Sequence, residues 1–290
     1  MKILITGAKG QLGHDLEIEL IKRGHQLILT DVDTMDITDK NAVFAFVKEA
    51  HPDVVIHAAA WTAVDAAEDE GKGKCMLINS VGTQNVADVT ASVGAKLMYI
   101  STDYVFDGNG TRPWKPDDKV TTPLNVYGLS KYQGELAVEN ATDKYFIVRI
   151  SWVFGINGKN FVKTMLNIGK DRKELSVVND QIGSPTYTKD LSVLLADMIV
   201  TEKYGIYHAA NEGYCSWFDF AKEIFDKVQH LGHAEYNDVV VKPVSSIEYK
   251  TKAKRPFNSR MDKTKLIENG FSLLPSWQDA LDRFLKELGY

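Results

Sequence analysis

The first thirteen residues constrain the fold of this chain more than any other stretch. The apolar run at residues 3–5 predicts a buried strand, and Gly7, Gly10 and Gly13 follow it at a spacing of three. From Leu16 onward, apolar residues recur at helical spacing. A strand, a glycine turn and a helix in this order provide the context that a dinucleotide-binding motif needs.

Each of the three glycines has a physical reason in such a motif. One lets the backbone turn sharply, one removes the Cβ that would keep the chain from a pyrophosphate, and one lets the helix pack close to the sheet. The pyrophosphate would lie on free N–H groups at the helix start, where the helix dipole favours an anion. The alternative is a tight turn that binds nothing, but the flanking strand and helix favour the dinucleotide.

Asp31 bears on the choice of cofactor. It ends a second apolar strand at residues 26–30, and it lies 18 residues after Gly13. A carboxylate near this distance can accept hydrogen bonds from the adenosine ribose and would repel a 2′-phosphate, which points towards NADH. A solvated acid at a strand end is an equally good interpretation, and Lys9 and Arg23 lie near enough in sequence to bind a phosphate. NADH and NADPH therefore both stay open.

Strand and helix patterns alternate through the first half of the chain. Further strands are expected at residues 53–57, 96–100 and 144–150, with helices between them. No connection is short enough for a hairpin, so the pattern predicts right-handed βαβ units and an α/β fold with a doubly wound, parallel, Rossmann-type sheet. Ligands of such sheets bind at the carboxyl ends of the strands. The residues expected at that edge are Thr6, Gly7, Asp31, residues 58–62, Ser101 and Thr102.

The alternation weakens beyond Trp152. Short strands separated by helices are expected at residues 174–178, 206–209 and 239–241, with helices at 217–228 and 277–288. We expect residues 1–155 to form mainly the cofactor-binding domain, and residues 156–290 mainly a smaller C-terminal α/β substrate domain. The boundary is expected to be interleaved, because a helix predicted at 188–199 would return residues 180–205 to the sheet.

Composition argues against several classes of function. The net charge is −5, from 34 basic and 39 acidic residues, and no basic stripe or tail appears, which argues against a nucleic-acid partner. No apolar run approaches the roughly 18 residues of a membrane span, and the chain enters a strand directly, so no signal peptide is expected. Cys75 and Cys215 are too few for a disulfide framework or a zinc site. We expect a protein of the reducing cytoplasm.

Tyr127 and Lys131 are the strongest catalytic candidates. They lie at i and i+4 in a predicted helix at residues 124–138, so they share a face. An ammonium beside a phenol favours the phenolate and is expected to lower the pKa of the tyrosine, which makes proton transfer near neutral pH more efficient. This spacing alone is often accidental. Here it follows a strand whose end offers the hydroxyl of Thr102 to a substrate carbonyl.

In this order, the motifs resemble the short-chain dehydrogenase/reductase superfamily, in its extended branch that modifies nucleotide sugars. Longer strings are similar to dTDP-4-dehydrorhamnose reductases, and they cover nearly the whole chain. These strings are residues 58–65 (AAAWTAVD) with Glu68, 101–108 (STDYVFDG), 125–131 (NVYGLSK), 149–155 (RISWVFG) and 180–186 (DQIGSPT), with Arg255, Pro256, Asn258 and Ser259.

The resemblance implies the last step of dTDP-L-rhamnose synthesis, in which NADH or NADPH gives hydride to C4 of dTDP-4-dehydro-L-rhamnose. By matching position, Tyr127 is the general acid that protonates O4. Lys131 tunes Tyr127 and holds the nicotinamide ribose, and Thr102 polarises the C4 carbonyl. Asp103 and Trp152 match positions near the sugar. The positions assigned to the cofactor, besides Tyr127 and Lys131, are Gly7, Gly10, Gln11, Leu12, Gly13, Asp31, Ala58, Ala60, Trp61 and Thr62.

The same family resemblance also raises a bound metal ion and a homodimer. Some family members are described as dimers held partly by Mg²⁺ on carboxylates. Asp15, Asp190 and Glu287 lie near the relevant positions, but two of them are Asp where Glu is expected. Solvated acids on helix surfaces are the better interpretation. A homodimer and a bound Mg²⁺ are therefore raised but not decided.

Two other functions stay open on this scaffold. A nucleotide-sugar epimerase would run a redox-neutral cycle that keeps NAD⁺ bound. A dehydratase is disfavoured, because Thr102 is followed by Asp103 and Tyr104 and not by two acids. The second open alternative is a non-catalytic protein, similar to the regulatory subunit of methionine adenosyltransferase. The intact Thr102, Tyr127 and Lys131 argue for catalysis.

Overall fold

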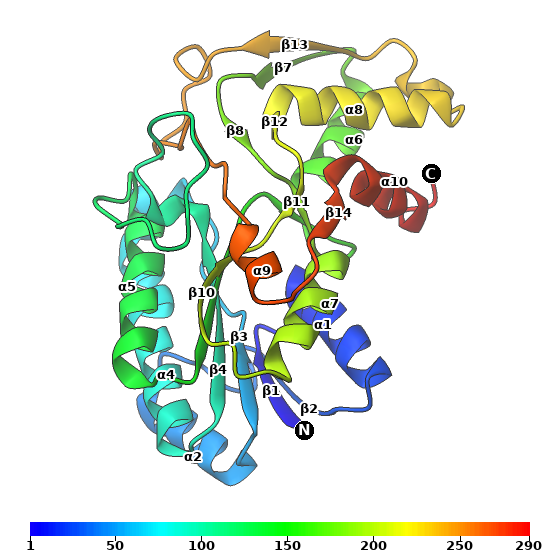
Figure 1. Cartoon of the computed structure of the whole chain (residues 1–290). Coiled ribbons are helices and arrows are strands. Elements are labelled where there is room, and N and C mark those ends of the chain that lie inside the picture. Colours follow the sequence, from blue (N-terminus) through cyan, green and yellow to red (C-terminus); the bar gives the residue numbers. More distant parts are fainter.

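The glycine turn lies where the order of the main sheet reverses. The computed structural model describes residues 1–290, and its six-stranded sheet has the order β10-β5-β4-β3-β1-β2 with every pair parallel (Figure 1). The chain runs from β1 outward to β2 and then back across β1 to β3, and such a switch point is where ligands of open α/β sheets bind. The strands are β1 (Lys2–Thr6), β2 (Gln26–Thr30), β3 (Val54–His57), β4 (Lys96–Thr102), β5 (Tyr145–Ile150) and β10 (Gly205–His208). The predicted α/β, doubly wound, parallel sheet is confirmed.

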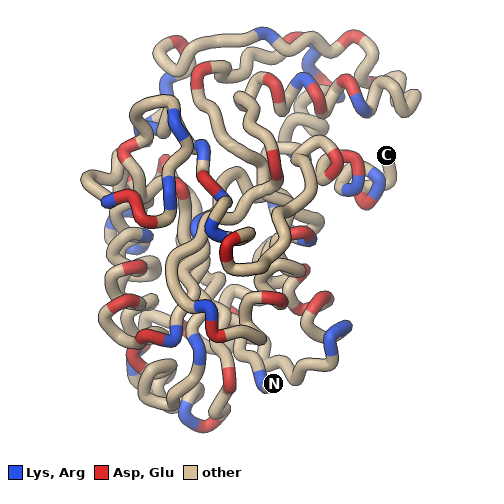
Figure 2. Tube along the Cα trace, viewed as in Figure 1, with Lys and Arg blue, Asp and Glu red and all other residues tan.

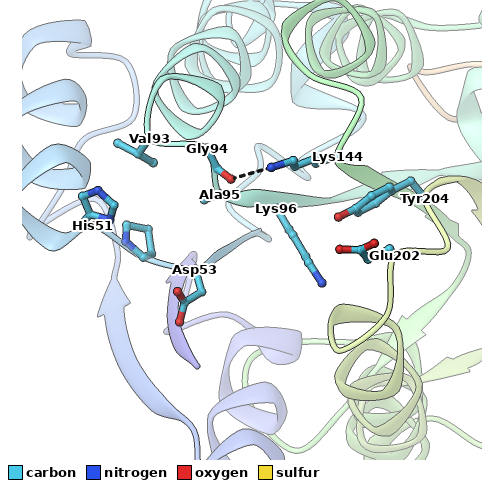
Figure 3. Close-up of a pocket in the computed structure, with 10 residues that line it drawn as sticks. His51, Asp53, Val93, Gly94, Ala95, Lys96, Lys144, Glu202 and Tyr204 are labelled. Atoms are coloured by element: carbon cyan, nitrogen blue, oxygen red, sulfur yellow. Dashed lines mark hydrogen bonds between the residues drawn. The ribbon is translucent and has the colours of Figure 1, made fainter.

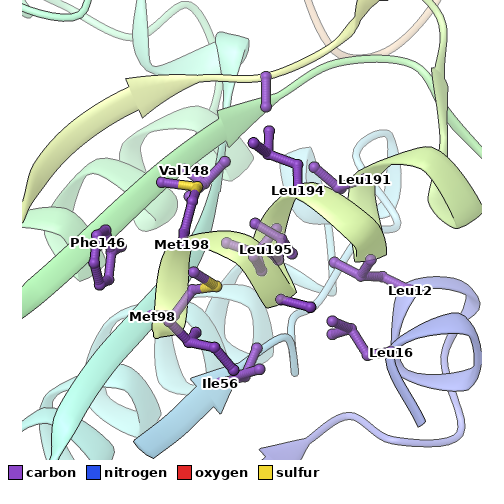
Figure 4. Close-up of a cluster of buried hydrophobic side chains, with 14 of the residues drawn as sticks. Leu12, Leu16, Ile56, Met98, Phe146, Val148, Leu191, Leu194, Leu195 and Met198 are labelled. Carbon is purple, nitrogen blue, oxygen red and sulfur yellow. The ribbon is translucent and has the colours of Figure 1, made fainter. Parts of the chain in front are cut away.

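Helices cover both faces of this sheet (Figure 1). On one face, leucines of α1 (Gln11–Lys22) and α7 (Thr188–Ile199) meet Ile56, Met98 and Val148 of the strands (Figure 4). On the other face, α2 (Lys40–Ala50), α4 (Thr83–Ser92) and α5 (Val126–Ala141) pack over Leu4, Leu97 and Ile147. Because strands buried on both faces need apolar residues throughout, the short unbroken apolar runs of the sequence are accounted for.

The helix before β4 begins earlier than the sequence indicates. A helix is predicted from residue 79 to 94, but α3 (Lys72–Met76) and a π-helical segment (Leu77–Gly82) lead directly into α4. Such π-helical turns are rare, and they often occur at functional sites. This segment carries Asn79, which is completely buried.

A second apolar core lies beyond the carboxyl edge of the sheet. It gathers aromatic side chains of α6 (Phe161–Asp171), α8 (Trp217–His230) and α10 (Trp277–Glu287) around Phe154 and Tyr187. Short strand pairs frame this core: β6 (Val153–Phe154) with β9 (Thr186–Tyr187), β7 (Glu174–Val178) with β13 (Val240–Val244), β8 (Ile182–Gly183) with β12 (Cys215–Ser216), and β11 (Asn211–Glu212) with β14 (Leu274–Ser276). A short helix, α9 (Thr264–Glu268), precedes β14. The chain therefore leaves the sheet after β5, builds part of this core, and returns through α7 and β10 (Figure 1).

A pocket of about 290 Å³ opens at the amino ends of the strands, away from the carboxyl edge (Figure 3). Its two lysines are already bonded: Lys144 donates to the carbonyl of Gly94, and Lys96 donates to the carbonyls of Ile199 and Thr201. These ammonium groups are thus used within the fold.

Basic and acidic residues are interspersed along the chain in the view of Figure 2. None of the helices combines the length and apolarity that crossing a membrane requires.

Candidate active site

The three glycines of the first turn have three different surroundings. Gly7 has φ +70°, and a Cβ there would lie 2.7 Å from the Ala59 nitrogen, while a Cβ on Gly13 would lie 2.3 Å from the Gly7 oxygen. The fold itself therefore requires these two glycines. A Cβ on Gly10 would meet only the Gly7 oxygen, at 3.1 Å, so Gly10 borders open space. Helix α1 begins beside it without a side-chain cap, and its free N–H groups suit an anionic diphosphate.

Two asparagines beyond β6 hold this turn in place, and no sequence motif indicates them. Asn157 donates to the carbonyl of Lys9 at 2.7 Å, and Asn160 donates to the Gln11 side chain at 3.0 Å. Their partners lie about 150 residues away in the chain. The second half of the chain thus helps to shape the start of α1.

Asp31 lies at the end of β2 and binds the glycine turn. One carboxylate oxygen accepts the N–H of Lys9 at 3.0 Å, and the other accepts the N–H of Val32 at 2.8 Å. The ammonium of Lys9 lies 2.5 Å from Asp33, and both of these side chains are mostly exposed. A ribose at this edge would share the oxygens of Asp31 with the backbone, and it would have a cation beside it.

Residues 58–62 leave the end of β3 and are held by Asn79. The Asn79 oxygen accepts the N–H of Trp61 at 2.8 Å, and its side-chain nitrogen donates to the Trp61 carbonyl at 3.0 Å. The same nitrogen donates to the Ser130 hydroxyl on α5, at 3.0 Å. Asn79 therefore ties the segment with Ala58, Ala60, Trp61 and Thr62 to the helix that carries the catalytic candidates. The sequence pattern places Asn79 only at the start of the predicted helix at residues 79–94.

Thr102 and Tyr127 are brought together by the way α5 begins. The Asn125 side chain caps α5 by accepting the N–H of Gly128 at 2.8 Å. A Cβ on Gly128 would lie 2.2 Å from the Tyr104 oxygen, so the helix packs directly against the turn that follows β4. Thr102 ends β4, and its hydroxyl donates to Asp103 at 3.0 Å. Burial raises the pKa of Tyr127 well above its usual value, and the Thr102 hydroxyl partly opposes this rise.

Lys131 does not lower the pKa of Tyr127 in the way the sequence predicted. Only 2% of the lysine is exposed, and burial lowers its own pKa to about 7, against the attraction of Glu135. Its ammonium lies 4.0 Å from the centre of the Tyr99 ring, and no hydrogen bond joins it to Tyr127. The prediction was wrong because burial of the phenol outweighs a charge that does not touch it. The ammonium has no hydrogen-bond acceptor within the chain, so its three donors are free for a ligand hydroxyl.

Asp103 and Trp152 lie at the carboxyl edge of the sheet. Asp103 is 3% exposed, one of its carboxylate oxygens has no hydrogen-bond partner, and burial raises its pKa to about 6. Trp152 follows β5 and adopts a left-handed backbone, with φ +49°. An unpaired buried oxygen and a strained backbone are both features that gather at binding sites.

A buried ion pair joins α5 to β5, and no sequence pattern indicates it. Arg149 of β5 contacts Glu135 of α5 through two hydrogen bonds of 2.9 and 2.7 Å, and the hydroxyl of Ser101 donates to the same carboxylate at 2.5 Å. Arg149 also donates to the carbonyl of Pro116 at 3.1 Å, in the loop after β4. The catalytic helix, the end of β4 and the loop at residues 107–123 are thereby joined.

The three carboxylates raised as possible Mg²⁺ ligands are not arranged as a metal site, and the favoured interpretation as solvated acids is wrong for the buried Asp15 and the mostly buried side chain of Asp190. Arg283 binds both oxygens of Asp190, at 2.6 and 2.7 Å, and Lys189 lies 2.7 Å from Glu287. Asp15 is buried and accepts a hydrogen bond from Thr188. No group of three acidic, histidine or cysteine side chains could hold a metal ion. Because cations of the chain already neutralise two of these carboxylates, the residues do not fit Mg²⁺.

The switch-point glycine turn and the Thr102, Tyr127 and Lys131 set at one sheet edge define a short-chain dehydrogenase/reductase of the extended type. The family model described as "RmlD substrate binding domain" matches residues 1–290. The chain belongs to this family.

Named relatives agree with this assignment. The chain is 43% identical to the dTDP-4-dehydrorhamnose reductase of Aggregatibacter actinomycetemcomitans, over 97% of each chain. It is 39% identical to the spore coat polysaccharide biosynthesis protein SpsK of Bacillus subtilis, over 99% of this chain and 97% of that one. Among solved structures, the dTDP-4-dehydrorhamnose reductase of Bacillus anthracis in complex with NADP superimposes with a TM-score of 0.93, at 45% identity and 99% coverage of both chains.

Proposed function

We propose that this protein reduces dTDP-4-dehydro-β-L-rhamnose to dTDP-L-rhamnose, with NAD(P)H as the hydride donor to C4, in the synthesis of dTDP-rhamnose for cell-surface polysaccharide. The observation that carries this proposal is the buried ammonium of Lys131, which has no acceptor within the chain and lies one helical turn from Tyr127. Family membership supplies the substrate, because the named relatives are reductases of this sugar nucleotide.

The residues of the site fit a nicotinamide dinucleotide. When bound, the nicotinamide supplies the hydride. The open side of Gly10 and the uncapped start of α1 suit the diphosphate. The free donors of Lys131 suit the hydroxyl groups of a ribose. The fit thus rests on an uncapped helix start and on an unbonded buried cation.

Tyr127 and Thr102 have complementary roles in the proposed reaction. Because burial raises the pKa of Tyr127, its phenol is protonated at neutral pH and is suited to give a proton to O4. The hydroxyl of Thr102 donates to Asp103 in the structure, and it would turn from that carboxylate to donate to the same carbonyl and orient it. Lys131, on the same face of α5, serves in this proposal to hold the cofactor ribose and not to tune Tyr127, because the pKa of Tyr127 is raised and not lowered.

We further propose a division of labour between the two cores. Residues 1–155 and the returning stretch at 180–205 hold the cofactor, and most of residues 156–290 hold the sugar nucleotide. Strand β10 lies in the main sheet beside β5, which supports extending the returning stretch to His208. Asp103 and Trp152 lie where the two cores meet, which supports their assignment to the sugar.

For the cofactor, we propose that NADPH and NADH both serve. Asp31 is engaged by two backbone N–H groups, and the nearby Lys9 ammonium is held only in an exposed ion pair with Asp33, for which a 2′-phosphate would compete. The solved relative from Bacillus anthracis holds NADP, which supports NADPH as a donor.

We propose that activity does not require Mg²⁺, because Arg283 and Lys189 occupy the candidate carboxylates. A chelator is expected to leave both the rate and the sedimentation coefficient unchanged. A loss of rate, or a shift in sedimentation, would show that a metal is needed. The sedimentation coefficient also tests whether the protein forms the homodimer that the family resemblance raised. We also propose a location in the reducing cytoplasm, because the two cysteines are buried and form no disulfide.

The reaction is tested by following oxidation of NADPH and of NADH with chemically defined dTDP-sugars. We expect oxidation with dTDP-4-dehydro-L-rhamnose and none without it, with dTDP-L-rhamnose as the product. An epimerase would convert a dTDP-sugar without net oxidation of the cofactor, and a regulatory subunit would convert nothing. Either result from correctly folded protein would refute the proposal.

A further inference from the structure

The backbone of Trp152 is held in a conformation that side chains rarely adopt. Trp152 and His51 are the two residues other than glycine with positive φ, +49° for Trp152. Such a backbone persists when the surrounding structure holds it, and it is often found where a side chain must be presented to a ligand. Trp152 connects β5 to β6, so it lies between the main sheet and the second core.

An aromatic stack holds the indole of Trp152. Its ring lies on that of Trp217, with centres 3.7 Å apart and planes 14° apart, and Trp217 in turn lies 4.6 Å from Phe161. On another side, a Cβ on Gly183 would lie 2.9 Å from the Trp152 ring, so Gly183 leaves just enough room for the indole. The backbone of Trp152 is fixed as well, because its carbonyl accepts the N–H of Thr186 at 3.1 Å.

Trp217 is itself fixed by the second core. It is the first residue of α8, and the preceding Ser216 forms a capping box with Asp219. The Ser216 hydroxyl also contacts the Asn179 side chain at 2.8 Å. Three residues further on, Phe220 is completely buried in that core. The position of Trp217 therefore depends on α8, not on the main sheet.

We propose that Trp217 is a positioning residue for the sugar: it holds Trp152 in the orientation that receives the sugar of the dTDP-sugar, without touching the substrate itself. This inference rests on the proposed function, in which Trp152 contacts the sugar. Stacked rings gain from close, nearly parallel contact, and a flat, rigid indole presents a large surface to a sugar at little entropic cost. The second core thereby sets the affinity for the sugar through one aromatic contact.

The test compares three variants of the full-length protein. Trp217→Ala removes the stack, Trp217→Phe keeps an aromatic ring, and Phe218→Ala removes a neighbouring aromatic side chain of α8 that also packs on the second core. For Trp217→Ala, we expect KM for the dTDP-sugar to rise about tenfold. The KM for NADPH should stay within about twofold, because the cofactor site is untouched. Trp217→Phe should recover most of the affinity for the sugar, and Phe218→Ala should retain all of it.

A spectroscopic readout separates positioning from general stability. Two stacked indoles couple their electronic transitions, so the wild-type protein should show an exciton couplet in far-ultraviolet circular dichroism. Trp217→Ala should abolish this couplet, and titration with dTDP-L-rhamnose should change it in the wild type alone.

Three results would overturn the inference. They are an unchanged KM for the sugar in Trp217→Ala, an equal loss of sugar and cofactor affinity, or the same loss in Phe218→Ala. If the wild type reduces no dTDP-sugar, the proposed reaction fails. In that case the couplet and its response to dTDP-L-rhamnose still decide whether Trp217 positions Trp152 for a sugar nucleotide, and a couplet that does not respond refutes the inference.

Discussion

The ammonium of Lys131 lies 4.0 Å from the centre of the Tyr99 ring, and the Tyr99 hydroxyl donates to the carbonyl of the same lysine at 3.3 Å. Tyr99, which lies on β4, therefore contacts both the side-chain ammonium and the main-chain carbonyl of Lys131. The close approach depends on Gly134, where a Cβ would lie 2.2 Å from the Tyr99 hydroxyl oxygen. A ring face attracts a cation, and this attraction matters most where water is scarce.

We expect Tyr99→Leu to make the charge of Lys131 easier to lose. The ring favours the ammonium, so its removal should lower the lysine pKa further below its present value of about 7. If the charged lysine supports catalysis, the alkaline decline of kcat/KM should then begin at a lower pH. Tyr99→Phe keeps the ring and should leave that decline in place. The other titratable groups near Lys131 are His57, Glu135, Cys75 and Tyr127, and all four remain in both variants. An unchanged profile in Tyr99→Leu would contradict the assigned contact.

Tyr127→Phe should separate proton donation from cofactor binding. We expect the rate to fall by roughly 10²–10⁴-fold, the contribution typical of a positioned general acid. Binding of NADPH, measured by fluorescence titration, should stay within about twofold, because the variant loses only a group that acts in the transition state. An equal loss of cofactor affinity would mean that Tyr127 mainly holds the cofactor.

Lys9→Ala should affect NADPH more than NADH. The exposed ammonium lies beside the Asp31 edge, and a 2′-phosphate would compete with Asp33 for it. We expect KM for NADPH to rise roughly two- to fivefold, a modest effect because the group is in water, with KM for NADH unchanged. Lys22→Ala, an exposed lysine at the far end of α1, is the matched control. If both cofactors lost affinity equally, Lys9 would instead matter through the glycine turn.

Removing one partner of the buried Glu135–Arg149 pair should destabilise the fold strongly. In Arg149→Met, the Glu135 carboxylate remains buried at 1% exposure without its cation. We expect the free energy of unfolding to fall by about 3–5 kcal/mol, measured by urea denaturation. The double variant Glu135→Gln with Arg149→Met should recover much of this loss, because no unpaired charge is left. A double variant as unstable as the single one would show that packing, not charge, dominates.

The local features of the site could be predicted from the sequence, and its long-range support could not. The glycine turn, the helix at 188–199 and the Tyr127/Lys131 pair all depend on spacing within a few residues, and the structure confirms the elements that carry them. Asn79, Asn157 and Arg149 were missed because each acts on a partner far along the chain, up to 148 residues away. A single asparagine or arginine carries no periodic signal that could reveal such a contact.

Two chemical expectations failed for a related reason. The pKa of Tyr127 depends on how deeply the phenol is buried, which spacing along a helix does not report. Asp190 is not the solvated helix acid that the sequence favoured, because Arg283, 93 residues away, binds both of its carboxylate oxygens. In both cases, the identity of the residue suggested a chemistry that its tertiary neighbours changed.

The return of the chain through α7 and β10 limits how this protein can be divided or recombined. A fragment ending near residue 155 would lack β10, so β5 would become an open edge able to pair with other chains. It would also lack α7, so the strand face shown in Figure 4 would keep α1 but lose the second helix that packs on it. Exchanging the sugar-binding part between relatives would therefore require three crossover points, one after β5, one before α7 and one after β10, with α7 and β10 kept from the parent that supplies the sheet.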